Sequence, residues 1–109
     1  MKRHTQKKIP WNNETWTLIR AKGRSKYLEK DSDGIAALAQ LHPDEKIIAF
    51  KASSPEIEIK YIIHEMIHYV TDIDDSEKGE IQVWHITNEI IDFLIANNIN
   101  LSLLTKGFE

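Results

Sequence analysis

The H-E-x-x-H motif of residues 64–68 is the feature that most constrains how this chain can fold. Its two histidines, His64 and His68, are four residues apart, so on a helix they lie on one face, about 40° apart around the axis. There they can hold one metal ion, with Glu65 beside it as a general base. A fold that uses this motif has to bring a further ligand to the same helix face.

The helix that carries the motif is predicted to begin after Ser54 and to end near Thr71. A serine cap followed by Pro55 and an early acid, Glu56, is typical of a helix start. The apolar positions of this segment form one broad stripe that indicates a core-facing side, namely Ile59, Ile62, Ile63, Met66, Val70 and Ile73. The two histidines lie off this stripe, on a narrower face that can open towards a cleft.

Glu80 is the expected third ligand. A second helix is predicted from near Ser76 to near Asn97, and Glu80 lies in the middle of its apolar stripe. A carboxylate on the core side needs a cation or hydrogen-bond donors, because burying it unpaired is very costly. The alternative is a solvated first-turn acid, which the helix dipole favours. The stripe of this helix consists of Val83, Trp84, Ile86, Thr87, Ile90, Ile91 and Leu94.

Other acids and histidines are less well placed to bind the same ion. Glu77 lies nearer the edge of the stripe, and His85 projects from the face expected to be solvated. Asp72, one turn after the motif, is either a partner that orients a ligand imidazole through a hydrogen bond or a plain helix-end acid. His4 and His42 are isolated in the sequence and are interpreted as surface residues.

The composition limits the class of protein. At 109 residues the chain is expected to form a single domain, residues 1–109, with one modest core. Its 41% hydrophobic and 28% charged residues are typical of a soluble globular protein, and its net charge of -3 argues against a dedicated nucleic-acid binder. The absence of cysteine excludes disulfides and thiolate metal sites and fits a cytoplasmic location. No apolar run is long enough to predict a membrane span.

The basic start of the chain is predicted to be a flexible tail over residues 1–10. It lacks the apolar stretch of a signal peptide. The alternative interpretation is a basic arm that contacts nucleic acid or an acidic partner.

The first half of the chain is predicted to supply strands. Residues 16–19 favour a strand after a polar turn at Asn12-Asn13, and Gly34 is expected to adopt a positive φ in a second turn. Residues 35–41 are ambiguous between helix and strand, whereas residues 46–50 clearly favour a strand, and the two segments are expected to pair as a β-hairpin. The sequence therefore predicts an α+β fold, in which a small antiparallel β-hairpin or sheet packs on the motif helix and a second, C-terminal helix.

The expected ligand set indicates a particular chemistry. Two neutral imidazoles and one carboxylate leave a zinc ion a fourth position for water, whose pKa falls towards neutrality. Glu65 is then placed to take the water proton and pass it to the leaving amine. Tyr61 is a candidate donor to the developing negative charge, whereas Tyr69 is interpreted as a packing residue.

The stretch from Tyr61 to Asp72 resembles the active helix of gluzincin-type zinc metallopeptidases, and is most similar to small phage and mobile-element metallopeptidases related to the ImmA/IrrE family. Residues 80–87 occupy the place of the second helix, which brings a glutamate in those proteins. The resemblance covers roughly residues 16–94. It implies a minimal zincin-like fold, with the two motif histidines and Glu80 as zinc ligands and Glu65 as the catalytic base.

These observations predict a zinc-dependent metallopeptidase that hydrolyses peptide bonds in a protein or peptide substrate, one candidate being a regulator. One alternative is a catalytically silent zincin-fold module that binds metal and interacts with a partner. A second alternative is a small α+β binding protein in which the histidine pair is accidental. The presence of Glu65 favours the enzyme, because a purely structural site has no need of that acid.

Overall fold

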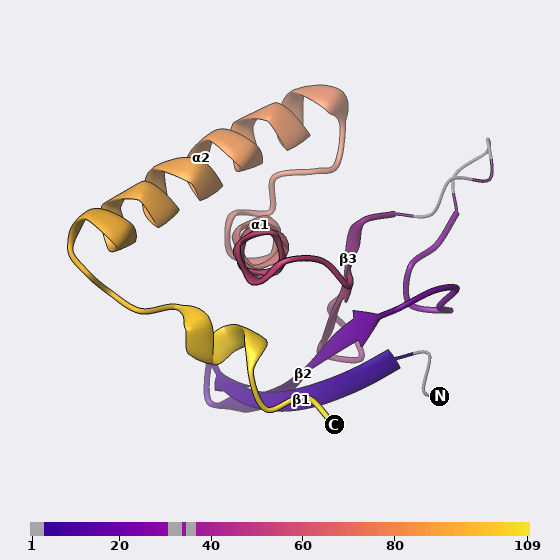
Figure 1. The fold of residues 1–109 in the computed structure, drawn as a ribbon. Coiled ribbons are helices and arrows are strands. Elements are labelled where there is room, and N and C mark those ends of the chain that lie inside the picture. Colours follow the sequence, from indigo (N-terminus) through magenta and orange to yellow (C-terminus); the bar gives the residue numbers. More distant parts are fainter. Residues whose placement is uncertain (1–3, 31–33, 35–36) are drawn as a thin grey trace.

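A computed structural model describes residues 4–30, 34 and 37–109 of the chain, and it shows an α+β fold, as the sequence predicts. Four strands form one sheet, and two helices lie on the same side of it (Figure 1). The elements are β1 (His4–Trp11), β2 (Glu14–Ala21), β3 (Ala39–His42), β4 (Ile47–Lys51), α1 (Pro55–Thr71), α2 (Glu77–Ala96) and the short 3-10 helix η1 (Ser102–Thr105).

The prediction of a flexible tail over residues 1–10 is wrong for the residues that the structure describes, because His4–Trp11 forms β1. Its side chains alternate between exposed and half-buried, and the turn residues Asn12 and Asn13 both have positive φ, as a tight hairpin turn requires. β1 therefore pairs antiparallel with β2 along its full length. Residues 1–3 lie outside the described part of the chain.

The sheet is larger than the expected hairpin, and it is mixed rather than antiparallel. Its strand order is β1-β2-β4-β3, in which β2 and β4 run parallel while both outer pairs are antiparallel. The predicted β3–β4 hairpin is confirmed, although residues 35 and 36 of the ambiguous segment are outside the described residues. Gly34 has the expected positive φ of 79°. Backbone bonds between Gln6 and Glu109 tie the end of the described chain to β1.

Both faces of the two central strands are covered. On one face, Trp16, Leu18 and Phe50 pack with Ile62 of α1. On the other face, Ile19 and Ala49 pack beneath Leu28 from the segment after β2. Burial on both faces is typical of a central parallel pair of strands. The contacts on the first face hold α1 on the sheet.

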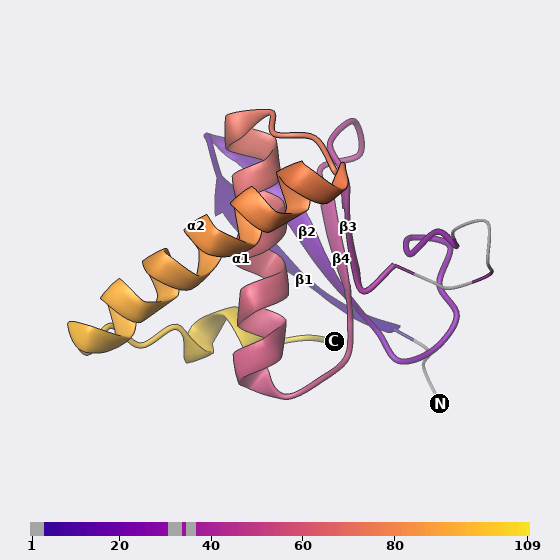
Figure 2. The ribbon, with the colours of Figure 1, turned by 90° about the horizontal axis from the view of Figure 1, so that it is seen from above.

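The convergence of His64, His68 and Glu80 predicts two helices that pack side by side over the sheet, but the helices instead form successive layers. α1 lies on the sheet, and α2 crosses the outer side of α1 (Figures 1 and 2). The interface between them buries Ile63, Ile67, Val83 and Ile91. Among the described residues, neither helix is long and apolar enough to cross a membrane.

Two members of the expected apolar stripes are exposed in this arrangement. Val70 is 65% exposed and Ile90 is 40% exposed, whereas Ile67, which lies outside the expected stripe, is buried. The difference arises because α2 crosses α1 at an angle, so each helix buries a shorter patch than a continuous stripe would suggest.

Candidate metal centre

The two motif histidines are brought together by α1. Its N-cap Ser54 has an extended backbone with Pro55 following, as predicted, although the Ser54 side chain makes no capping hydrogen bond. His64 and His68 are one turn apart, and their Nε2 atoms lie 3.1 Å from each other. His64 is buried, with 3% of its surface exposed, and the indole ring of Trp84 packs against its imidazole with the ring centroids 4.1 Å apart.

Glu80, from the first turn of α2, completes the cluster. Its Oε2 lies 3.0 Å from Nε2 of His64, and its Oε1 lies 2.6 Å from Nε2 of His68. The side chain of Glu80 is 37% exposed, so one side of the cluster faces solvent. The three residues that the sequence suggests as ligands therefore converge, and they form a group that could hold a metal ion.

A backbone carbonyl orients the imidazole of His68, so of the two interpretations of Asp72 the helix-end acid fits the structure. The Nδ1–H of His68 donates to the carbonyl oxygen of Ile73, with the two heavy atoms 2.8 Å apart. Asp72 is instead the C-cap of α1 in the left-handed conformation, and its N–H bonds to the carbonyl of His68. This left-handed turn redirects the chain, so that the next carbonyl can reach back to the ring.

The donor set fits a bound cation. Because Nδ1 of His68 carries its proton towards Ile73, Nε2 of the neutral ring presents a lone pair to the Glu80 carboxylate. Facing acceptors repel each other unless a proton or a metal ion lies between them. A tetrahedral zinc site places its ligand atoms about 3.3 Å apart, given zinc–ligand bonds of about 2 Å. The observed separations need only a small outward movement to reach that geometry.

The pKa values of the two imidazoles move in opposite directions. Burial lowers the pKa of His64, against the opposing pull of the Glu80 carboxylate. Burial also acts to lower the pKa of His68, but the hydrogen bond to the Ile73 carbonyl and the charges of Glu65 and Glu80 together raise it. Without a cation, a proton on His68 balances the negative charge, and a divalent ion would replace that proton.

Glu65 lies beside the cluster with only 8% of its surface exposed. Desolvation by burial raises the pKa of Glu65 to about 7, with the nearby carboxylates of Glu80 and Asp75 adding to the shift and His68 opposing it. A carboxylate whose pKa lies near neutrality is well suited to accept and release a proton. A neighbouring cation favours the ionised form and prepares Glu65 to act as a base.

A cavity of about 920 Å³ opens onto the cluster. It is bordered by α1, the start of α2, the link between these helices, and the edge strand β3. Tyr61 lines this cavity with its ring edge-on to Trp84, so the expected charge-stabilising donor is near the cluster. Trp84 and the Ile73 carbonyl were not recognised as site components from the sequence, although Trp84 lies one turn after Glu80 on the same helix.

The other titratable residues considered from the sequence lie apart from this cluster. His85 is exposed, as expected, and Glu77 is exposed as well. Tyr69 packs between Trp11 and Trp16, which confirms its packing role. The interpretation of His42 as an isolated surface residue is wrong, because its half-buried ring bonds through Nε2 to the carbonyl of Tyr27.

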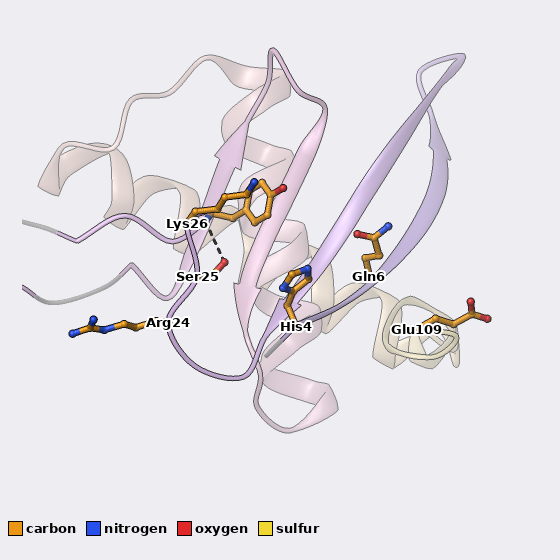
Figure 3. Close-up of a pocket in the computed structure, with 7 residues that line it drawn as sticks. His4, Gln6, Arg24, Ser25, Lys26 and Glu109 are labelled. Atoms are coloured by element: carbon orange, nitrogen blue, oxygen red, sulfur yellow. Dashed lines mark hydrogen bonds between the residues drawn. The ribbon is translucent and has the colours of Figure 1, made fainter. Parts of the chain in front are cut away.

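A smaller cavity of about 570 Å³ lies near His4, on the opposite side of the sheet from the helices. Figure 3 shows that Arg24 and Glu109 extend away from His4 on opposite sides, so their charged groups do not converge. His4 itself lies edge-on to the ring of Tyr27. This cavity therefore lacks the convergent polar groups that the His64–His68–Glu80 cluster has.

Comparisons of this chain with protein-family models, with curated proteins and with solved structures each found no match, so its function has to be argued from the site itself.

Proposed function

We propose that this chain is a zinc-dependent metallopeptidase with a gluzincin-type site. His64, His68 and Glu80 would hold the ion, and this is the ligand set of zinc sites that keep an open position for chemistry. When bound, zinc supplies Lewis-acid chemistry, lowering the pKa of a water molecule and polarising the substrate carbonyl. The convergence of these three side chains on one point carries the proposal.

Glu65 is the residue that would move protons. Its carboxylate accepts a proton as water adds to the carbonyl carbon of the peptide bond, and it delivers that proton to the amide nitrogen as the C–N bond breaks. The products are a carboxylate and an amine. The burial of Glu65 beside the cluster supports this role, and its pKa of about 7 in the metal-free protein indicates surroundings that favour uptake of a proton. Tyr61, which lines the cavity, is the candidate donor to the negative charge that develops on the carbonyl oxygen.

The form of the cavity supports a peptide as substrate. β3, which borders the cavity, is an edge strand of the sheet. Edge strands present unpaired N–H and C=O groups, and an extended peptide can add to such an edge through backbone hydrogen bonds. A peptide bound in this way would pass close to Glu65 and to the metal ligands, which line the same cavity.

The charge around the cavity favours substrates with basic side chains. Glu29, Asp72, Asp74 and Asp75 are exposed acids that line it, whereas Lys30 is the one lysine or arginine among the described lining residues. Hydrogen bonds from Ser76 lower the pKa of Asp74, which keeps that carboxylate ionised. Such an arrangement concentrates cationic ligands near the site, so we expect peptides with lysine or arginine near the scissile bond to be preferred.

Replacing Glu65 with glutamine tests the proposed reaction. We expect Glu65→Gln to retain zinc and the fold but to lose hydrolysis by roughly two to four orders of magnitude, the contribution of a general base. The assay is cleavage of a peptide library rich in basic residues by zinc-loaded protein, read by mass spectrometry, with Glu89→Gln on the exposed face of α2 as the matched control. Zinc binding without cleavage by the wild type would instead support a metal-binding interaction module, and equal cleavage by Glu65→Gln would contradict the assigned mechanism.

A further inference from the structure

The link between α1 and α2, residues 72–76, contacts both sides of the candidate metal centre. Its first residue, Asp72, has a left-handed backbone with φ of 57° and bonds to the carbonyl of His68. The next residue, Ile73, accepts the Nδ1–H of His68 at 2.8 Å. The start of the link therefore sets the direction in which this ligand imidazole points.

The end of the link is joined to the first turn of α2 by side-chain hydrogen bonds. Oδ1 of Asp74 accepts from the backbone N–H of Ser76 at 3.1 Å and from its hydroxyl at 2.5 Å. Oγ of Ser76 in turn accepts from the backbone N–H of Gly79 at 3.1 Å. The backbone N–H of Glu80 bonds to the carbonyl of Ser76 at 2.8 Å. A continuous set of bonds thus connects the link with the residue that bears the third ligand.

Gly79 is the point at which the link and α2 come closest. A Cβ atom built on this buried glycine would lie 2.2 Å from the carbonyl oxygen of Asp74 and 2.6 Å from its Oδ1. Both distances are shorter than any real Cβ contact, and the nearer atom belongs to the backbone and cannot swing aside. Gly79 has an ordinary helical position, so the glycine is required by the contact and not by its backbone conformation.

We infer that Gly79 is a positioning residue for the candidate metal centre, an inference that rests on the proposed metal-binding function. Gly79 immediately precedes Glu80, and Asp74 immediately follows Ile73, which holds His68. The close contact between Gly79 and Asp74 therefore fixes how far the Glu80 carboxylate lies from the imidazole of His68. Any side chain at position 79 would separate the link from α2 and move these two ligands apart.

The test compares two glycine-to-alanine variants. Gly79→Ala is expected to weaken zinc affinity at least about ten-fold, as loss of a well-placed supporting group does, in a competition titration against a chelator. It should also change the visible absorption spectrum of the cobalt-substituted protein, because the coordination geometry changes. Gly23→Ala is the matched control, since a Cβ atom there would meet nothing within 4 Å. Unchanged affinity and spectrum in folded Gly79→Ala would overturn the inference.

A second variant keeps the test decisive if Gly79→Ala does not fold. Ser76→Ala removes the hydroxyl that bonds to both Asp74 and the N–H of Gly79, and so loosens the contact between the link and α2. We expect it to fold and to weaken zinc affinity about two- to five-fold, a smaller loss than a directly supporting group causes. An affinity equal to that of the wild type would contradict the inference.

A measurement on the metal-free protein tests this inference independently of the proposed function. If the wild type binds neither zinc nor cobalt, the proposed function fails, and positioning by Gly79 is then judged by the ¹⁵N chemical shifts of the His68 ring. These shifts report the bonds of His68 to Ile73 and Glu80. Gly79→Ala should change them and Gly23→Ala should not. Identical ring shifts in the wild type and in folded Gly79→Ala would overturn the inference independently of any metal.

Discussion

Two clusters of buried polar side chains lie along α1, and they differ in how completely their polar atoms are paired. Near the start of the helix, Glu58 accepts two hydrogen bonds from Arg20 at 2.8 and 2.9 Å and one from the backbone of Ser53 at 3.0 Å. Arg20 also donates to the carbonyl of Thr105 and lies over the ring of Phe108. This cluster is closed, with one negative and one positive charge in direct contact.

The second cluster, His64–His68–Glu80, is not closed in this way. The Nε2 atoms of His64 and His68 and the carboxylate of Glu80 point towards one another, and Nδ1 of the buried His64 has no hydrogen-bond partner among the described residues. Buried polar groups in native proteins are nearly always paired, and exceptions concentrate at functional sites. The comparison teaches that burial and charge alone do not mark a site. The two clusters differ in whether the protein's own residues provide hydrogen-bond partners for all of the buried polar atoms.

Removing both histidines should give the largest effect that separates the clusters. We expect the His64→Ala, His68→Ala double variant to lose zinc affinity by about 10⁴-fold, because the total binding free energy of a zinc site, about 10–16 kcal/mol, is shared among its ligands. Zinc content after dialysis, measured by mass spectrometry on protein without a histidine tag, checks this. Undiminished zinc in the double variant would show that the ion binds elsewhere.

Breaking the Arg20–Glu58 cluster should lower the stability of the fold without changing its affinity for zinc. Glu58→Ala leaves the half-buried Arg20 without its carboxylate partner, so we expect the free energy of unfolding to fall by about 3 kcal/mol, with the zinc affinity of the folded protein unchanged. Chemical denaturation measures the first quantity and chelator competition the second. Glu14→Ala, which breaks the exposed Glu14–Lys46 pair, is the control and should cost less than about 1 kcal/mol. A large loss of zinc affinity in Glu58→Ala would mean that the two clusters are coupled.

The stability of the metal-free protein should depend on pH through the raised pKa of Glu65. Its pKa is raised from 4.5 to about 7 on folding, so the folded state holds this proton more tightly than the unfolded state does. The resulting stabilisation is fully present below about pH 4.5 and is lost as the pH rises through 7, a change on the order of 3 kcal/mol. Denaturation midpoints of wild type and Glu65→Gln, measured with a chelator present from pH 4.5 to 8, check this. The two proteins should diverge as the pH rises, with the variant the more stable, and parallel curves would contradict the prediction.

The smallest expected effect concerns the third ligand. Glu80→Gln should weaken zinc binding by about ten-fold or more, corresponding to about 1.4 kcal/mol, because an amide oxygen is a poorer ligand than a carboxylate. Glu77→Gln, one turn earlier and exposed, is the matched control, and His85→Ala should likewise have little effect. Chelator competition ranks the three variants. A larger loss in Glu77→Gln or His85→Ala would show that a different face of α2 meets the metal.

Local patterns accounted for the elements that carry the candidate site. The start of α1 at Pro55 and its end at Thr71 follow from the serine–proline start and from the apolar stripe, and the β3–β4 pairing follows from two short apolar segments around a turn. The Asn12-Asn13 turn also carries a signal for a hairpin, because asparagine tolerates the positive φ that a two-residue hairpin turn requires. That signal would have identified β1 in place of a tail. Glu58 lies one turn before Ile62 on the same helix face, and this position next to a core residue indicates a buried acid.

The sequence by itself determined which residues can serve as metal ligands, because the spacing of His64 and His68 is a property of the helix and is independent of its surroundings. Only the tertiary structure decided that β2 and β4 run parallel, that the carbonyl of Ile73 holds His68, and that Gly79 allows the close approach to Asp74. These features join residues through packing and backbone geometry, which no short sequence pattern encodes. The raised pKa of Glu65 belongs to the same group, since it depends on water being excluded by the surrounding fold.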